Sequence, residues 1–301
     1  MRNALIIATD SRYLAAMVAV AGSCSQSVTV FAVGDASLAE SAASSGAGKV
    51  VHFDTKGDLA PMAYADAIAR EAEGLSPDLI MGNDAPATRA LLVAAARARN
   101  ASVFSDVVDI ASEPEGFCAT CGVAGGIAVR CVHVQGSLAA VYGGKEDGDG
   151  SPSQAEVTLF EGSACDLRVV ERIAPKDAFD LKSATRIVGV GRGVRSSDDL
   201  AMAEELASLL GGVVACTLPV SEDNHWYDGS RVLGSSHNSA APDLYLALGI
   251  SGSPNHLSGV KDAKAIVAVN SNPDAEIFKR CDYGIVADLY DFVPALQRAL
   301  A

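Results

Sequence analysis

The first half of the chain alternates short apolar runs, rich in β-branched residues, with alanine-rich stretches. The apolar runs predict strands at Ala4–Ala8, Ser27–Val33, Lys49–Phe53 and Asp78–Gly82. The stretches between them predict helices at Ser11–Ala21, Pro61–Glu73 and Pro86–Asn100. Strands that alternate with helices are typical of a parallel sheet joined by crossover helices. The first half is therefore predicted to be an α/β domain.

The pattern changes between Val107 and Val141, where β-prone runs follow one another with Gly125 and Gly126 as a turn. This segment predicts an antiparallel appendage to the first domain. The stretch Gly143–Gln154 is acidic and rich in glycine, and it lacks apolar periodicity. We expect it to be an exposed loop of the same domain.

A second series of strands and helices begins near residue 184. Its apolar runs predict strands at Arg186–Val190, Val213–Cys216, Leu244–Leu248, Ala265–Val269 and Gly284–Ala287. Its amphipathic segments predict helices at Asp199–Leu210, with Ser196 or Ser197 as N-cap, and at Phe292–Ala301. We place the domain boundary near residue 182, in the charged stretch Arg172–Ser183. The predicted fold is α/β, with an N-terminal domain at 1–182 and a Rossmann-like, doubly wound parallel sheet at 183–301.

Composition narrows the classes of function. The 301 residues carry a formal charge of −14, which argues against sequence-independent binding to nucleic acid. No apolar run reaches the ~20 residues of a membrane-spanning helix, and the first predicted strand begins too early for a signal peptide. Seven scattered cysteines fit a reducing compartment better than a disulfide framework. We expect a cytoplasmic protein without membrane insertion.

Polar residues and glycines follow the end of each strand in the second domain. These segments are Gly191-Arg192-Gly193, Thr217, Gly249-Ile250-Ser251-Gly252, Asn270-Ser271-Asn272 and Asp288. In open parallel sheets ligands bind outside the carboxyl ends of the strands, so these segments should converge. Glycines let backbone N–H groups approach a phosphate, which helix N-termini also favour. The domain is therefore predicted to bind a nucleotide, although any one of these turns alone could be purely structural.

The glycine spacing after the first of these strands disfavours a stand-alone nicotinamide dehydrogenase. Gly189, Gly191 and Gly193 place the third glycine one residue too early for the dinucleotide fingerprint.

The motifs of the second domain resemble a known family. Gly249-Ile250-Ser251-Gly252 followed by His256 and Gly259, together with DYGIVADL at Asp282–Leu289, is similar to the electron transfer flavoprotein alpha subunits. The residues that resemble its Fix-type branch are Cys216, Pro219, Val220, Glu222, Trp226 and Arg231. The first domain resembles the family only in its αβ pattern and length.

The resemblance implies a cofactor and a partner. Family members form a heterodimer with a beta subunit, which the N-terminal domain would contact, and bind FAD in the C-terminal domain. They carry electrons from a dehydrogenase or NADH to an acceptor such as a quinone oxidoreductase, ferredoxin or an acyl-CoA or enoate reductase. The C-terminal domain would reorient on the linker near residue 182 during transfer.

The resemblance also implies roles for individual residues. Arg192 and Thr217 would lie beside the cofactor, Ser236 of the loop Leu233–Ser236 near the flavin ring, and Ser251–His256 around the pyrophosphate and ring edge. His256 would donate near the flavin O2, which would stabilise the negative charge of a reduced flavin. Asn270 and Asp288 would hold the adenosine half. The full predicted set is Arg192, Thr217, Leu218, Leu233, Gly234, Ser235, Ser236, Ser251, Gly252, Ser253, Pro254, Asn255, His256, Asn270, Asp288 and Leu289.

Several positions depart from the family pattern. Thr217-Leu218 stands where most members carry a Ser-Arg pair whose arginine covers the ring. We therefore expect Leu218 to tune the flavin toward a lower potential or a less stable semiquinone. Pro254 removes a backbone donor from the phosphate loop, Ser271 replaces a lysine and Ser235 a glutamine. These departures leave open a second hypothesis, a nucleotide-binding regulatory or assembly subunit with lost or retuned redox activity.

The cysteines around Cys118 are a weak metal motif. Cys118-x-x-Cys121 lies near Cys131 and His133, but structural zinc sites use four ligands and the chain has no second CxxC pair. We therefore expect no metal site.

Overall fold

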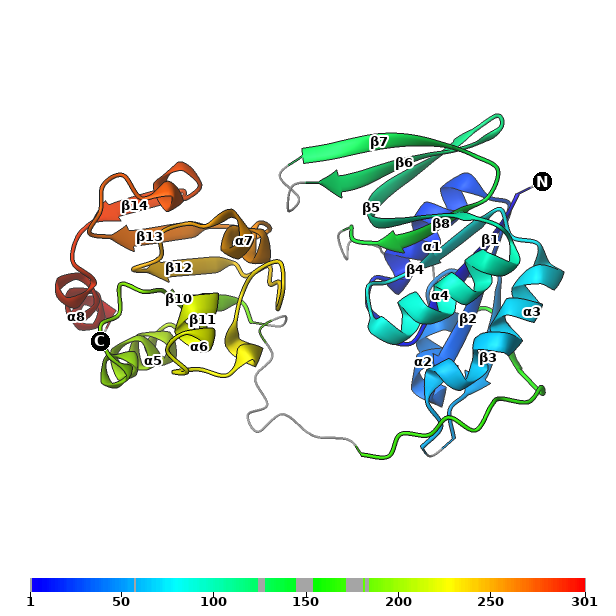
Figure 1. The fold of residues 1–301 in the computed structure, drawn as a ribbon, viewed down its shortest axis with the longest axis horizontal. Helices are drawn as coiled ribbons and strands as arrows, with labels where there is room; N and C mark the ends of the chain where they lie inside the picture. Colours follow the sequence, from blue (N-terminus) through cyan, green and yellow to red (C-terminus); the bar gives the residue numbers. More distant parts are fainter. Residues whose placement is uncertain are drawn as a thin grey trace. The chain divides into compact units, whose positions relative to one another are not determined.

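The computed structural model describes residues 2–56, 58–123, 128–144, 154–171, 181 and 184–300, which form two compact units (Figure 1). The described residues up to 171 belong to the N-terminal unit and those from 181 onward to the C-terminal unit. Each unit has its own sheet and its own hydrophobic clusters. The predicted turn at Gly125 and Gly126, most of the predicted loop and the predicted boundary near 182 lie outside the described residues.

The N-terminal unit contains a single mixed sheet. Its described strands are β1 (Asn3–Ala8), β2 (Ser27–Gly34), β3 (Lys49–Asp54), β4 (Leu79–Gly82), β5 (Ser102–Glu113), β6 (Gly116–Val123), β7 (Ala128–Gln135), β8 (Leu138–Tyr142) and β9 (Val157–Leu159). They lie in the order β7-β6-β5-β8-β4-β1-β2-β3-β9. In this spatial order every neighbouring pair from β5 through β8 to β9 is parallel. The two remaining pairs, β5-β6 and β6-β7, are antiparallel.

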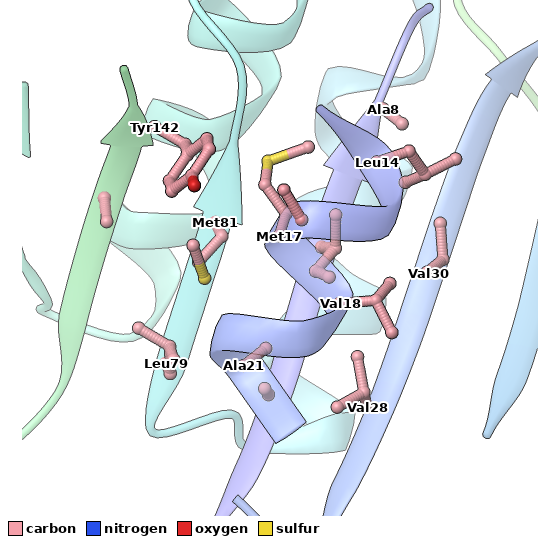
Figure 2. Close-up of a cluster of buried hydrophobic side chains, with 14 of the residues drawn as sticks. Ala8, Leu14, Met17, Val18, Ala21, Val28, Val30, Leu79, Met81 and Tyr142 are labelled. Carbon is pink, nitrogen blue, oxygen red and sulfur yellow. The ribbon is translucent and has the colours of Figure 1, made fainter. Parts of the chain in front are cut away.

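Helices cover both faces of this sheet. They are α1 (Leu14–Cys24), α2 (Ala36–Ala43), α3 (Ala65–Leu75), which follows the 3-10 turn η1 (Pro61–Tyr64), and α4 (Pro86–Ala98). Residues of α1 and α2 share one hydrophobic cluster with alternate strand residues, and residues of α3 and α4 share the cluster on the other face. Figure 2 shows Leu14, Met17, Val18 and Ala21 of α1 directed at side chains of β2 and β4. Strands buried on both faces explain the continuous apolar runs of the sequence.

Three predictions for this unit need correction. The helix predicted at Ser11–Ala21 begins at Leu14, because Tyr13 adopts a left-handed conformation with φ 60°, which an α-helix does not accommodate. A helix was not predicted at Ala36–Ala43, where Asp35 caps α2 by accepting from the Leu38 amide. Strand β5 begins at Ser102, but its residues 102–104 pair in parallel with β8, and its antiparallel pairing with β6 begins at Val107, as predicted. The last strand of the predicted appendage, β8, is not antiparallel and pairs in parallel with β4 and β5.

The C-terminal unit is built on a five-stranded, all-parallel sheet among its described residues. Its strands are β10 (Arg186–Val190), β11 (Val213–Cys216), β12 (Leu244–Leu248), β13 (Ile266–Asn270) and β14 (Tyr283–Val286), in the order β11-β10-β12-β13-β14. The connecting elements are η2 (Ser197–Asp199), α5 (Leu200–Leu209), α6 (Leu218–Glu222), η3 (Gly229–Arg231), α7 (Pro254–Leu257), η4 (Ser258–Val260), η5 (Glu276–Lys279) and α8 (Leu289–Leu300). The predicted α/β fold with a doubly wound C-terminal sheet is confirmed.

Local capping signals set the start of two helical segments in this unit. Ser196 caps the first helical segment in a capping box with Asp199, as the sequence predicted for Ser196 or Ser197. The last helix begins at Leu289 instead of Phe292, because Asp288 accepts a hydrogen bond from the Tyr290 amide at 2.9 Å and so caps the first turn.

Candidate functional site

A cavity of about 660 Å³ opens at the carboxyl ends of the strands in the C-terminal unit. It is lined by residues that follow all five strands, from β10 to β14. The strand order reverses between β10 and β12, and in doubly wound sheets such a reversal leaves a crevice between the two diverging loops. The position of the cavity therefore follows from the topology of the sheet.

Glycines let the loops after β10 and β12 pack against each other. A Cβ atom on Gly191 would lie 2.5 Å from the carbonyl oxygen of Gly249, and one on Gly193 would lie 2.6 Å from the Gly249 Cα. Gly249 itself has φ 62°, a conformation that favours glycine. Two bare backbone turns thus form the floor of the cavity, as close approach to a pyrophosphate requires.

Two arginines lie at this floor in an otherwise acidic chain. Arg192 is exposed and makes no hydrogen bond or ion pair with another described residue, so its guanidinium is available to a ligand. Arg195 donates to Asp288 at 2.7 Å, and its guanidinium lies 4.3 Å from the centroid of the Tyr290 ring. The Tyr290 hydroxyl in turn donates to Asp199 at 2.7 Å. One arginine is therefore fixed by its neighbours and the other is free to bind an anion.

His256 is buried, with 6% of its surface exposed, and both of its ring nitrogens have protein partners. Its Nδ1 lies 2.9 Å from the carbonyl oxygen of Leu233, which can only accept, so Nδ1 carries the proton. The Tyr245 hydroxyl donates to Nε2 at 2.7 Å. Burial lowers the pKa of His256 to about 4, so the ring is neutral at physiological pH. The neutral ring has no N–H left to donate, which contradicts the expectation that His256 donates to the flavin O2.

The loop that carries Ser236 is joined to the turn that carries His256. The Ser235 amide donates to the carbonyl of Asn255 at 2.8 Å, beside the contact between His256 and Leu233. A Cβ atom on Gly259 would lie 2.3 Å from the Gly234 nitrogen, so only glycine allows this approach. Two segments more than fifteen residues apart thus form one wall of the cavity.

Asn270 links two strand ends at the far side of the cavity. Its Nδ2 donates to the Ile250 carbonyl at 2.8 Å, and its Oδ1 accepts from the Asn272 amide at 2.9 Å. The side chain therefore orients the loops after β12 and β13, in addition to lining the cavity.

The end of β11 gives the cavity an apolar edge. Thr217 is buried, and Leu218, which is 41% exposed, begins α6 and lines the cavity. Among the described lining residues, no lysine or arginine lies at this edge of the cavity. Both lining arginines follow β10 instead.

The structure gathers nearly all of the predicted site residues. Every member of the predicted set lines this cavity except Gly252 and Pro254, which line a neighbouring hollow of about 500 Å³. The lining residues that were absent from the predicted set are Gly191, Gly193, Arg195, Pro219, Val232, Gly249, Ile250, Val269, Ser271 and Ala287. Arg195 could have been found from its position two residues after the glycine turn. Val232 and Val269 carry no sequence signal, because buried strand residues do not differ in type from other core residues.

The N-terminal unit has a different cavity at the equivalent strand ends. It measures about 710 Å³ and its lining includes the carboxylates of Asp10, Asp35 and Asp54. Lys56 also lines this cavity but pairs with Asp54 at 3.7 Å, so the described lining keeps a net negative charge that would repel a phosphate. The cavity of the C-terminal unit is therefore the better candidate for a nucleotide.

No helix among the described residues is long and apolar enough to cross a membrane.

Comparison with known proteins agrees with this geometry. The model of the electron transfer flavoprotein FAD-binding domain matches residues 180–261, and that of the electron transfer flavoprotein domain matches residues 8–142. The protein named "Putative electron transfer flavoprotein subunit YdiR" of Escherichia coli (strain K12) is 32% identical over 252 residues, which cover 79% of this chain and 78% of that protein. "Protein FixB" of Escherichia coli O17:K52:H18 is 40% identical over 134 residues, which cover 44% of this chain and 43% of FixB. The chain thus belongs to the electron transfer flavoprotein alpha subunit family and contains an FAD-binding domain.

Proposed function

We propose that the chain holds FAD in the C-terminal cavity and carries electrons as the alpha subunit of a heterodimeric electron transfer flavoprotein. The observation that carries the proposal is the convergence of five strand ends on one cavity with a bare glycine floor. Bound FAD would supply the redox chemistry through its isoalloxazine ring. The residues of the chain would bind and orient the cofactor and keep water from one face of it.

The lining suggests how the cofactor would be divided between the loops. The turns at Gly191–Gly193 and Gly249–Ser251 would receive the pyrophosphate, with Arg192 as its counter-charge. Ser236 and Leu218 would lie near the flavin ring, and Asn270 and Asp288 near the adenosine half. His256 would act as a positioning residue, because its ring is already committed to Leu233 and Tyr245.

The proposed partners follow from family membership. A beta subunit would complete the heterodimer, and a dehydrogenase or NADH would supply electrons for an acceptor such as a quinone oxidoreductase, ferredoxin or an enoate reductase. The scattered cysteines, all of them free thiols in the structure, support a place in the cytoplasm.

The visible spectrum of the co-expressed, co-purified heterodimer tests the proposal. A carrier is expected to hold stoichiometric FAD that dithionite bleaches and air restores. Arg192→Gln is expected to reduce the FAD content, whereas Arg298→Gln, a change in the last turn of α8, is expected to leave it unchanged. A colourless heterodimer that takes up no added FAD would refute the proposal.

A second candidate function is a regulatory or assembly subunit that binds a nucleotide without redox work. It is favoured by the uncharged edge at Leu218 and by Ser271, which both lie in the cavity. A heterodimer that binds an adenine nucleotide tightly and remains colourless with added FAD would support this second function.

A further inference from the structure

The outer face of the β5-β6-β7 hairpins carries a cluster of metal-binding side chains outside the cofactor cavity. These strands lie side by side (Figure 1). On β6, Phe117, Ala119 and Cys121 are buried, with Phe117 fully covered, whereas Cys118 lies on the opposite face. Because side chains alternate along a strand, this opposite face points away from the core.

Cross-strand pairing brings the cluster together. Cys118 is the direct partner of His133 on β7, and Glu113 of β5 lies at the adjoining end of the hairpin. One ligand atom from each of these three residues lies within 4.8 Å of the others. His133 Nδ1 is 2.8 Å from the Glu113 carboxylate. The donors therefore come from three strands and are close before any metal is present.

A second thiol lies beside this group. Cys131 is two residues before His133 on β7 and therefore shares its face, and its Sγ is 3.8 Å from the hydroxyl of Thr120. Cys131 is therefore the diagonal cross-strand neighbour of Cys118 on the same face, at a separation that side chains can bridge, although its sulfur lies outside the group of three ligand atoms within 4.8 Å.

We propose that Cys118, Cys131 and His133 bind a zinc-type divalent cation, with Glu113 as the carboxylate that orients the imidazole. Two soft thiolates with an imidazole select zinc or a similar thiophilic ion over magnesium or calcium. A histidine ligand commonly gives its other N–H to a carboxylate, which is the contact that His133 makes with Glu113. Three protein ligands leave one tetrahedral position for water or a group from a partner.

The exposure of the site is compatible with metal entry. The His133 side chain is 71% exposed and that of Glu113 is 34% exposed, and Cys131 is exposed as well. On binding, each thiol loses its proton to solvent as its sulfur–metal bond forms, so two protons leave for each cation bound. No electron is transferred in this step.

The spacing of the cysteines in the sequence does not reveal this cluster, because its members pair across strands. The apparent pair Cys118 and Cys121 is divided between the two faces of β6, and Cys121 belongs to the hydrophobic core. The ligands pair across strands instead, and sequence spacing does not show strand register.

Metal titration of the purified full-length chain, kept reduced, tests the proposal. We expect one Zn²⁺ per chain in competition with a chromophoric chelator. We expect Co²⁺ to give the intense visible bands and the thiolate charge-transfer band of a tetrahedral sulfur-ligated site. Cys118→Ser and Cys131→Ser are each expected to abolish the charge-transfer band or halve it, and Glu113→Gln to weaken zinc binding by roughly 10-fold or more.

A matched control separates the cluster from other thiols. Cys165 is also exposed but lies outside the hairpins, and Cys165→Ser is expected to leave affinity and spectrum unchanged. Circular dichroism should show that the substituted chains keep the fold, since the changes lie on an exposed face. Binding that survives both Cys118→Ser and Cys131→Ser, or the absence of stoichiometric binding to the reduced wild-type chain, would overturn the proposal. So would a Cys118–Cys131 disulfide whose reduction yields no metal-binding site.

Discussion

His256 is a buried, neutral hydrogen-bond link between the sheet and a loop of the cavity. Tyr245 of β12 donates to one ring nitrogen, and the other nitrogen donates to the carbonyl of Leu233. Gly189 on the neighbouring strand leaves room for the Tyr245 side chain, since a Cβ atom at that position would lie 2.0 Å from the Tyr245 hydroxyl. Histidine at this position therefore fixes the loop Leu233–Ser236, and its charge state decides whether it can do so.

The buried imidazole should make stability depend on pH. The pKa of His256 is about 4 in the folded chain against an ordinary value of 6.5, so the unfolded chain takes up a proton first as pH falls. The stability that the neutral ring contributes is present above pH 6.5 and is lost as pH falls toward 4, by an amount on the order of 3 kcal/mol. Urea unfolding measured between pH 7 and 4 should show a flatter pH dependence for His256→Gln than for the wild type.

The exposed His237 provides the matched control. His237→Gln should retain the wild-type slope, because it leaves the buried His256 and its two hydrogen bonds in place. An unchanged slope in His256→Gln would show that other groups cause the acid lability.

Leu218 should set the electrostatic environment of the flavin. It lines the cavity with an uncharged side chain, so Leu218→Arg would add a cation at this edge. A positive charge there stabilises added electrons and should raise the flavin midpoint potential, on the order of 50 mV for a one-electron step. Potentiometric titration of the heterodimer measures the shift. Leu218→Met, which adds no charge, should leave the potential near that of the wild type, and equal potentials for Leu218→Arg and Leu218→Met would refute the hypothesis.

At the scale of elements, two strand-to-helix turns determine the shape of the cavity floor. The loops after β10 and β12 touch through backbone atoms, and the Gly193 amide donates to the Gly249 carbonyl at 3.0 Å. Neither loop can move independently of the other while this bond and the close packing at Gly191 persist.

Gly193→Ala should separate the two loops. The new Cβ would meet backbone at 2.6 Å, which side-chain rotation cannot relieve, so a stability loss of about 1–3 kcal/mol is expected together with a reduced FAD content. Chemical denaturation and the flavin absorbance of the purified heterodimer measure the two effects.

Gly22→Ala is the control for the chemistry of the substitution. Gly22 lies on the exposed side of α1, and a Cβ atom added there would have no other atom within 4 Å, so alanine should stabilise the helix by about 0.5–1 kcal/mol. If Gly193→Ala behaved as Gly22→Ala does, the packing argument for the cavity floor would be wrong.

At the scale of the whole molecule, the two units have separate cores. The C-terminal unit encloses clusters on both faces of its own sheet, and one of them includes Leu181, which is 3% exposed. Leu181 packs in the same cluster as Ile187 and Tyr245, so the C-terminal unit extends at least to residue 181.

The C-terminal unit should fold as a separate fragment. A fragment of residues 180–301 is expected to show a cooperative urea transition, because it retains both hydrophobic clusters. A fragment of residues 184–301 lacks Leu181 and should be less stable by about 1.5–3 kcal/mol, the value of burying one leucine side chain. Equal urea midpoints for the two fragments would show that Leu181 does not stabilise the hydrophobic core. A gradual transition in both fragments would show that the unit does not fold alone.

The sequence by itself determined the class of fold, most strands and the region of the site. The bounds predicted for β11 and β12 match the structure, because buried parallel strands are short apolar runs between glycines and polar residues. The strand-end residues could be predicted to converge because the carboxyl ends of parallel strands share one edge of a sheet. These inferences use only chain neighbours and the periodicity of strands and helices.

Only the tertiary structure decided which side chains meet. The Tyr245 and Leu233 partners of His256 leave the ring without a donor for a cofactor, and the register of β6 and β7 places Cys118 opposite His133. The sequence predicted a donor at His256, and the spacing of the cysteines did not show that Cys118 faces His133. Contacts between distant segments depend on register and packing, and a shift of one residue would reverse the face of every side chain on a strand. Such contacts therefore become visible only when the strands are paired in space.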